Sequence, residues 1–219
     1  MSKSSTTFGL SQAERAVGAL HNRVIFSRRV QVLAQAIASK IPAEAAVLDV
    51  GAGSGDMAVA VLASKPALNI EGVDVLVRPN TAIPVRQFDG EHLPHHDAEF
   101  DYAMLVDVLH HTDDPGALLA EVGRVARRII IKDHFRNGLF AGTRLRFMDW
   151  VGNAAHGVRL PYNYLSRAEW QRIWDRGGFR VLDLDESFRL YPAPLDWVFG
   201  RGLHFIAVIE AGSGSDAHQ

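Results

Sequence analysis

The sequence predicts an α/β fold, with a doubly wound sheet of about seven strands, mostly parallel, and helices on both faces. Short apolar runs alternate with stretches of helical periodicity, as expected for parallel strands joined by crossover helices. The clearest run, residues 46–50, leads into three alternating glycines, Gly51, Gly53 and Gly55, and then into an apolar helical pattern at 57–62. This order is typical of a buried strand, a tight turn and a helix.

The composition limits the classes of function. With 219 residues, of which 47% are hydrophobic, the chain is large enough for one globular domain with a full core. Cysteine is absent, which excludes disulfides, thiolate metal sites and cysteine nucleophiles. The formal net charge is -2 and no long basic stretch occurs, so a nucleic-acid partner is not favoured. We interpret the small arginine groups as solvated faces: Arg28-Arg29, Arg124-Arg127-Arg128 and Arg144-Arg146.

Neither a signal peptide nor an apolar run of about eighteen residues is present, so we expect a cytoplasmic protein without a membrane partner. A single domain is expected over 1–211. Its parts are N-terminal helices within 11–40, a core at 45–133, an insertion at 134–164, and a C-terminal helix and strands at 165–211. The Gly/Ser-rich tail at 212–219 is expected to be disordered.

The strands are predicted from apolar runs bounded by turn residues. They are 46–50, 69–73, 84–88, 100–106, 128–132, 179–184 and 203–209, the last of them antiparallel to its neighbours. The segment 75–82, between the second and third strands, is too short for a regular helix and contains Pro79. We therefore expect a loop where a crossover helix would normally lie.

The helices are predicted from capping residues and apolar stripes. Capping-box spacing occurs at Ser11 and Glu14 and again at Ser166 and Glu169, and Asp113 or Asp114 can cap a helix that begins at Pro115. One N-terminal helix has an apolar stripe formed by Phe26, Val30, Leu33 and Ile37. The N-terminal helices either close over the glycine turn as a lid or simply pack against the sheet.

Two motifs carry a family resemblance. The pattern Asp-x-Gly-x-Gly-x-Gly at 49–55 resembles motif I of the class I S-adenosylmethionine (SAM)-dependent methyltransferases. A dinucleotide fingerprint would need a glycine at Asp56, and the lysine of a P-loop is absent. The run Phe-Asp-x5-Asp-Val-Leu-His-His-x-x-Asp-Pro-x-x-Leu-Leu-x-Glu-Val-x-Arg-Val at 100–125 resembles the methyltransferase type 11 group. The resemblance covers 45–133 and implies a Rossmann-like fold.

The resemblance implies SAM as cofactor, with S-adenosylhomocysteine (SAH) as product. Asp74, at the end of a strand, would hold the ribose hydroxyls, although this geometry suits any nucleoside and does not separate SAM from NAD. Asp89 and Gly90 would meet the adenine, and Asp49 the ammonium of the methionine end. The other residues assigned to the cofactor site are Gly51, Ala52, Gly53, Val75, Leu105, Val106, Asp107 and His110.

Candidate bases for an oxygen or nitrogen acceptor are His110, His111 and His134, which follow strand ends. The alternative is that the family histidine packs near the cofactor without moving a proton. The insertion at 134–164 leaves the carboxyl end of a strand, so we expect it to line the acceptor pocket, and the candidate substrate contacts are Trp150, Tyr162 and Tyr164. The alternative is an extra helix that only thickens the core.

A histidine group, His92, His95 and His96, is expected to lie in a solvent-exposed loop, and no metal site is predicted. The predicted function is methyl transfer from SAM to a small-molecule acceptor, at O or N. One alternative is a protein that binds SAM or SAH without turnover. A nicotinamide-dependent oxidoreductase is disfavoured by Asp56.

Overall fold

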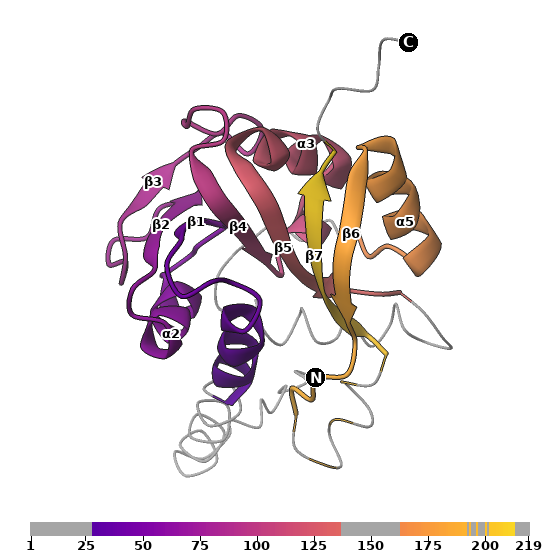
Figure 1. Ribbon diagram of the computed structural model, residues 1–219, viewed down its shortest axis with the longest axis horizontal. Helices are drawn as coiled ribbons and strands as arrows, with labels where there is room; N and C mark the ends of the chain where they lie inside the picture. Colours follow the sequence, from indigo (N-terminus) through magenta and orange to yellow (C-terminus); the bar gives the residue numbers. More distant parts are fainter. Residues whose placement is uncertain are drawn as a thin grey trace, which may run out of the picture.

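The computed structural model describes residues 28–136, 163–191, 193, 196, 200 and 202–212. They form one seven-stranded sheet in the order β3-β2-β1-β4-β5-β7-β6, flanked by helices (Figure 1). The strands are β1 (Ala46–Val50), β2 (Asn69–Asp74), β3 (Val85–Gln87), β4 (Phe100–Val106), β5 (Ala126–His134), β6 (Phe179–Asp185) and β7 (His204–Ala211). The helices are α2 (Asp56–Ser64), the 3-10 turn η1 (Leu109–His111), α3 (Pro115–Val125), α5 (Arg167–Arg176) and a helix over 28–38.

The sheet confirms the predicted fold. Strands β3, β2, β1, β4 and β5 pair in parallel, and β7 runs antiparallel between β5 and β6. The chain first moves outward from β1 to β3 and then returns to β4 on the other side of β1. In doubly wound sheets, ligands bind at the carboxyl ends of the strands where the order reverses. The glycine turn after β1 lies at that position.

Two apolar layers cover the two faces of the sheet. On one face, Leu105 and Ile131 pack with residues of α3 and α5, including Trp170. On the other face, Met104 and Ile130 pack with the helix over 28–38 and with α2. Alternation along β4 and β5 produces this division, because successive side chains point to opposite faces.

The described helices follow the predicted signals. The side chain of Asp114 accepts a hydrogen bond from Ala117 N (3.0 Å) at the start of α3, and Ser166 and Glu169 form a complete capping box on α5. In the helix over 28–38, Leu33 and Ile37 of the predicted stripe are buried.

Residues 75–84 contain no helix, which confirms the loop predicted at 75–82. Several strand boundaries differ from the predicted ones by one or two residues. Strand β5, for example, begins at Ala126, immediately after α3, so the helix passes into the strand without a turn.

Several predicted features lie outside the described residues. These are the capping box at Ser11 and Glu14, residue Phe26, the substrate candidates Trp150 and Tyr162, and the tail beyond residue 212. Among the described helices, none combines the length and apolar character needed to cross a bilayer.

Candidate active site

The turn between β1 and α2 requires glycine. Gly51 and Gly53 have φ angles of 76° and 58°, in the left-handed region that L side chains rarely adopt. A Cβ atom at Gly51 would stand 2.5 Å from Cγ2 of Val108, so no side chain fits there. The backbone of Gly51 is held by a hydrogen bond from its N–H to Val73 O (2.8 Å). Bare main chain therefore lines the carboxyl end of β1.

Asp74, the last residue of β2, faces this turn. One of its carboxylate oxygens accepts a hydrogen bond from Gly53 N (2.8 Å), and the other accepts one from Leu76 N (2.9 Å). A carboxylate oxygen can accept two hydrogen bonds, so each oxygen keeps capacity for a further donor. The two main-chain bonds fix the carboxylate in an orientation that suits a pair of ligand hydroxyls.

Asp49 is buried within β1, with 2% of its surface exposed. Among the described residues, its Oδ2 has no hydrogen-bond partner. Burial, with a further contribution from the Asp74 carboxylate, raises the pKa of Asp49 to about 7. A buried carboxyl group with an unused oxygen suits a cationic ligand group, because a nearby positive charge would restore the ionised form.

The loop after β3 lies beside the residue that follows β2. Asp89 accepts hydrogen bonds from the main-chain N–H groups of His92 (2.6 Å) and Glu91 (2.8 Å), which lower its pKa to about 2. Gly90 has a φ of 93°, and a Cβ atom there would lie 3.3 Å from Cγ1 of Val75. The structure thus brings Val75 next to Gly90, which follows Asp89 in the chain.

A second polar group lies at the carboxyl ends of β4 and β5. Asp107, directly after β4, has a φ of 59°, and its N–H donates to Lys132 O (2.9 Å). Its two carboxylate oxygens are ion-paired with Lys132 and with Arg29 from the helix over 28–38. Burial opposes ionisation, but these cations hold the pKa of Asp107 well below its usual range.

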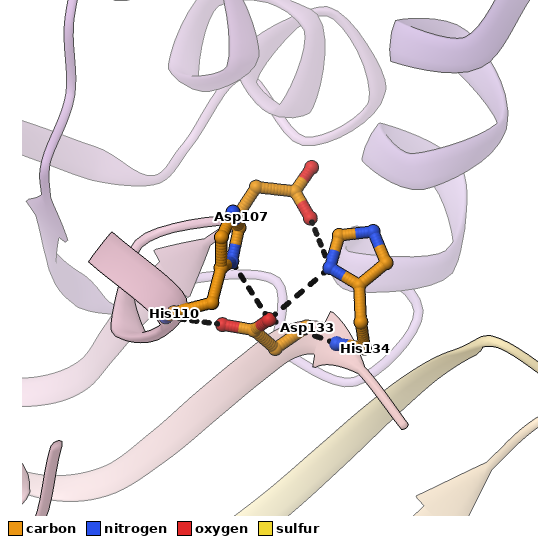
Figure 2. Close-up of side chains that lie close together, drawn as sticks. All are labelled: Asp107, His110, Asp133 and His134. Carbon is orange, nitrogen blue, oxygen red and sulfur yellow. Dashed lines mark hydrogen bonds and ion pairs between the residues drawn. The ribbon is translucent and has the colours of Figure 1, made fainter. Parts of the chain in front are cut away.

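Asp133, near the end of β5, joins two histidines (Figure 2). Its Oδ1 lies 2.9 Å from Nδ1 of His110 and 3.2 Å from Nδ1 of His134, and all three side chains are buried. Burial raises the pKa of Asp133, but the two imidazoles outweigh it, and the net shift is downward. The predicted residues His110 and His134 therefore share one ionised carboxylate.

Aromatic and imidazole rings surround this group. The ring of Tyr164 stacks on His110, with centroids 5.3 Å apart, and the ring of His111 lies 4.0 Å from that of His110. On the other side, His134 packs against His204 of β7 at 4.7 Å. Burial and the charge of Lys132 lower the pKa of His134 to about 4 and depress that of His204. Both rings are neutral at physiological pH.

Four of these side chains, Asp107, His110, Asp133 and His134, offer ligand atoms within 4.8 Å of one another. The charges nearby argue against a metal ion there. Both oxygens of Asp107 already pair with Lys132 and Arg29, so a dication would add a third positive group to one carboxylate. We interpret the group as an acid–base network.

Sequence reasoning missed three members of this group: Arg29, Lys132 and His204. The interpretation of Arg28-Arg29 as a solvated face was wrong for Arg29, whose partner Asp107 is far away in sequence. Lys132 did carry a signal, because it follows Ile129-Ile130-Ile131 in a strand buried on both faces, where a charge needs a partner. Nothing in the sequence around His204 indicated its neighbours.

The lowered pKa of His134 predicts a pH-dependent stability. The unfolded chain takes up a proton at this residue near pH 6.5, and the folded chain near pH 4. The stability that His134 contributes is therefore present above pH 6.5 and is lost as the pH falls toward 4. Between pH 7 and pH 5, we expect wild type to lose roughly 2 kcal/mol relative to His134→Asn, in urea unfolding followed by tryptophan fluorescence.

The variant His96→Asn, which replaces an exposed histidine distant from this group, serves as control and should show the wild-type pH dependence. Equal pH dependence in wild type and His134→Asn would contradict the assignment of a depressed pKa to His134.

A family model described as a methyltransferase domain matches residues 21–184. No curated protein sequence matches the chain. Among solved structures, a chain from a complex of the Haloferax volcanii Trm112 methyltransferase activator is similar to this chain. The two share 16% sequence identity with a TM-score of 0.65, and the comparison covers 92% of this chain and 97% of the other.

Two further structures share the fold. A SAM-dependent methyltransferase from Methanosarcina mazei has 15% identity and a TM-score of 0.60, and one from Mesorhizobium loti has 17% and 0.58. Each comparison covers 80% of this chain and 96% of the other. Because the family model spans more than half of the chain, the protein belongs to the methyltransferase domain family, with the class I fold and SAM as cofactor.

Proposed function

We propose that this protein transfers a methyl group from SAM to an oxygen or nitrogen atom of a small-molecule acceptor. The observation that carries the proposal is the Asp133 carboxylate, which orients His110 and His134 beside the carboxyl ends of β4 and β5. That edge adjoins the glycine turn after β1, because β1 pairs directly with β4.

The residues around the glycine turn fit the cofactor. The unused oxygen of Asp49 suits the ammonium group, and the doubly anchored carboxylate of Asp74 suits the ribose hydroxyls. Gly90, which follows Asp89, lies beside Val75, and this arrangement supports the proposal that these residues meet the adenine. When bound, SAM supplies an electrophilic methyl group on sulfur. The main task of the protein is then to align the acceptor, and good alignment can contribute on the order of 7–11 kcal/mol.

An acceptor hydroxyl or amine must lose a proton during transfer. We assign the Nδ1–H tautomer to both imidazoles, because Nδ1 of each lies within hydrogen-bond distance of Asp133 Oδ1. In this tautomer, Nε2 carries the lone pair that can take up a proton. His134 is a weak base, because its pKa is lowered to about 4. His110 is the better candidate, because Asp133 would stabilise the imidazolium formed there.

Tyr164 and His111 support this arrangement. The Tyr164 ring stacks on His110 and is itself buried, so it limits rotation of the proposed base. We propose that Tyr164 also forms part of the acceptor wall. His111 is partly exposed and neighbours His110, which makes it a secondary candidate as base.

The proposed reaction predicts a methylated product. Purified protein, incubated with isotopically labelled SAM and a small-metabolite extract, should yield labelled product by mass spectrometry. With that acceptor, His110→Gln should lower kcat by about 100-fold or more, since general base catalysis contributes 10²–10⁴-fold. The control variant His96→Gln, which replaces an exposed histidine, should retain wild-type turnover. Binding of SAM without any labelled product would favour the binding protein, and full turnover by His110→Gln would remove the base assignment.

The raised pKa of Asp49 predicts how SAM affinity varies with pH. Below about pH 7, the free protein holds a proton on Asp49, which an arriving ammonium group must displace. Affinity should therefore rise about tenfold from pH 5.5 to pH 7, below the range in which the ligand's own amino group titrates. Titration calorimetry in buffers of different ionisation enthalpy should detect the released proton.

Asp49→Asn should bind SAM more weakly at pH 7 and should release no proton. An equal pH slope in this variant and in wild type would contradict the role proposed for Asp49.

A further inference from the structure

A second cluster lies away from the proposed active site. Glu71 from the middle of β2 meets His95 and Glu99 from the loop that leads into β4. Glu99 precedes the first residue of β4, whereas Asp107 follows the last, so the two clusters lie at opposite ends of that strand. The prediction that this loop is solvent-exposed is wrong for His95, whose side chain is only 1% exposed. Its neighbours His92 and His96 are exposed, as expected.

The distances in this cluster are too long for strong hydrogen bonds. Nδ1 of His95 lies 3.5 Å from Oε1 of Glu71 and 3.4 Å from Oε1 of Glu99. An N–H···O bond is usually about 2.7–3.2 Å long, and one N–H group cannot serve two carboxylates well. Tetrahedral coordination with bonds of 2.0–2.2 Å would separate the ligand atoms by about 3.3–3.6 Å. The observed separations from Nδ1 match those of a coordination site.

Among the described residues, Nδ1 of His95 and the Oε1 atoms of Glu71 and Glu99 that face it have no strong hydrogen-bond partner. The other oxygen of Glu71 lies 3.9 Å from Arg86, and the other oxygen of Glu99 accepts a hydrogen bond from His96 N (2.7 Å). Arg124 of α3, which reaches this loop, instead binds Asp97, Glu121 and two loop carbonyls. Two carboxylates thus converge on one imidazole nitrogen, an arrangement that a cation between them would stabilise.

The imidazole itself is a second observation. Nε2 of His95 is buried and has no hydrogen-bond partner among the described residues, while the ring packs edge-to-face on Phe100 at 5.0 Å. This ring position directs Nδ1, and not Nε2, at the two carboxylates. Imidazole nitrogen and carboxylate oxygen are both zinc ligands, so Nδ1 is the ring atom placed to bind an ion.

We propose that Glu71, His95 and Glu99 bind a divalent transition-metal ion, with Zn²⁺ as the best match. One imidazole nitrogen and two carboxylate oxygens are typical zinc ligands, whereas Mg²⁺ and Ca²⁺ prefer oxygen ligands alone. The side chains of Glu71 and Glu99 are 30% and 37% exposed, so solvent can supply the fourth ligand. The loop that carries His95 also carries Asp89 and Gly90. The ion would therefore tether to β2 the loop proposed to meet the adenine.

The test is zinc binding by the full-length protein after removal of metal with a chelator. Competition with a chromophoric chelator should show one Zn²⁺ bound by wild type. Glu71→Gln and Glu99→Gln keep side-chain size on a partly exposed surface, and each should weaken zinc binding by at least about tenfold, since even residues that only orient ligands contribute 10- to 100-fold. His96→Gln, on the same loop, and His110→Gln, in the acid–base network, should bind zinc as wild type does. In hydrogen exchange, Zn²⁺ should protect residues 91–99 of wild type but not of Glu71→Gln.

Absence of zinc binding by wild type would overturn the proposal. So would unchanged binding in both glutamine variants, or a loss of binding confined to His110→Gln, which would place the ion in the acid–base network. The outcome is independent of the proposed methyl transfer, since no step of the test uses SAM or an acceptor.

Discussion

The cofactor side of this protein depends on a backbone constraint at the end of β1. The left-handed conformation at Gly51, together with the Val108 side chain where its Cβ would stand, excludes any other residue there. Because the turn is held to β2 through the hydrogen bonds from Gly51 and Gly53, the carboxylates of Asp49 and Asp74 lie close enough to influence each other. One local constraint thereby brings bare main chain and two carboxyl groups together at the carboxyl end of β1.

The adjoining strand ends are organised by charge. Asp107 pairs with Lys132 on β5 and with Arg29 on the helix over 28–38, so one carboxylate connects three segments of the chain. Burial, together with the positive charge of Lys132, lowers the pKa of His134 and of His204 and keeps both rings neutral. Asp133 then orients His110 with a second carboxylate. The Asp107 carboxylate thus neutralises two cations, and the Asp133 carboxylate orients the imidazoles.

Local signals predicted most of the fold and several residues of the candidate site. The glycine pattern, the strand-end aspartates and the cap residues Asp114 and Ser166 are short-range features, and the structure confirms their local geometry. Partners distant in sequence could not be predicted, because register and packing decide them. Arg29 meets Asp107, and Glu71 meets His95, only through the packing of a helix and a loop on the sheet. Lys132 was the exception, since a charge within a buried strand was visible in the sequence.

We propose that the glycine turn and Asp74 together hold the cofactor, and a crystal structure with SAH bound would show whether they do. We expect both ribose hydroxyls within about 3.2 Å of the Asp74 carboxylate oxygens, with the amino group of SAH beside Asp49 and its sulfur on the side of His110. Density for SAH at any other position, or ribose hydroxyls that do not contact Asp74, would contradict it.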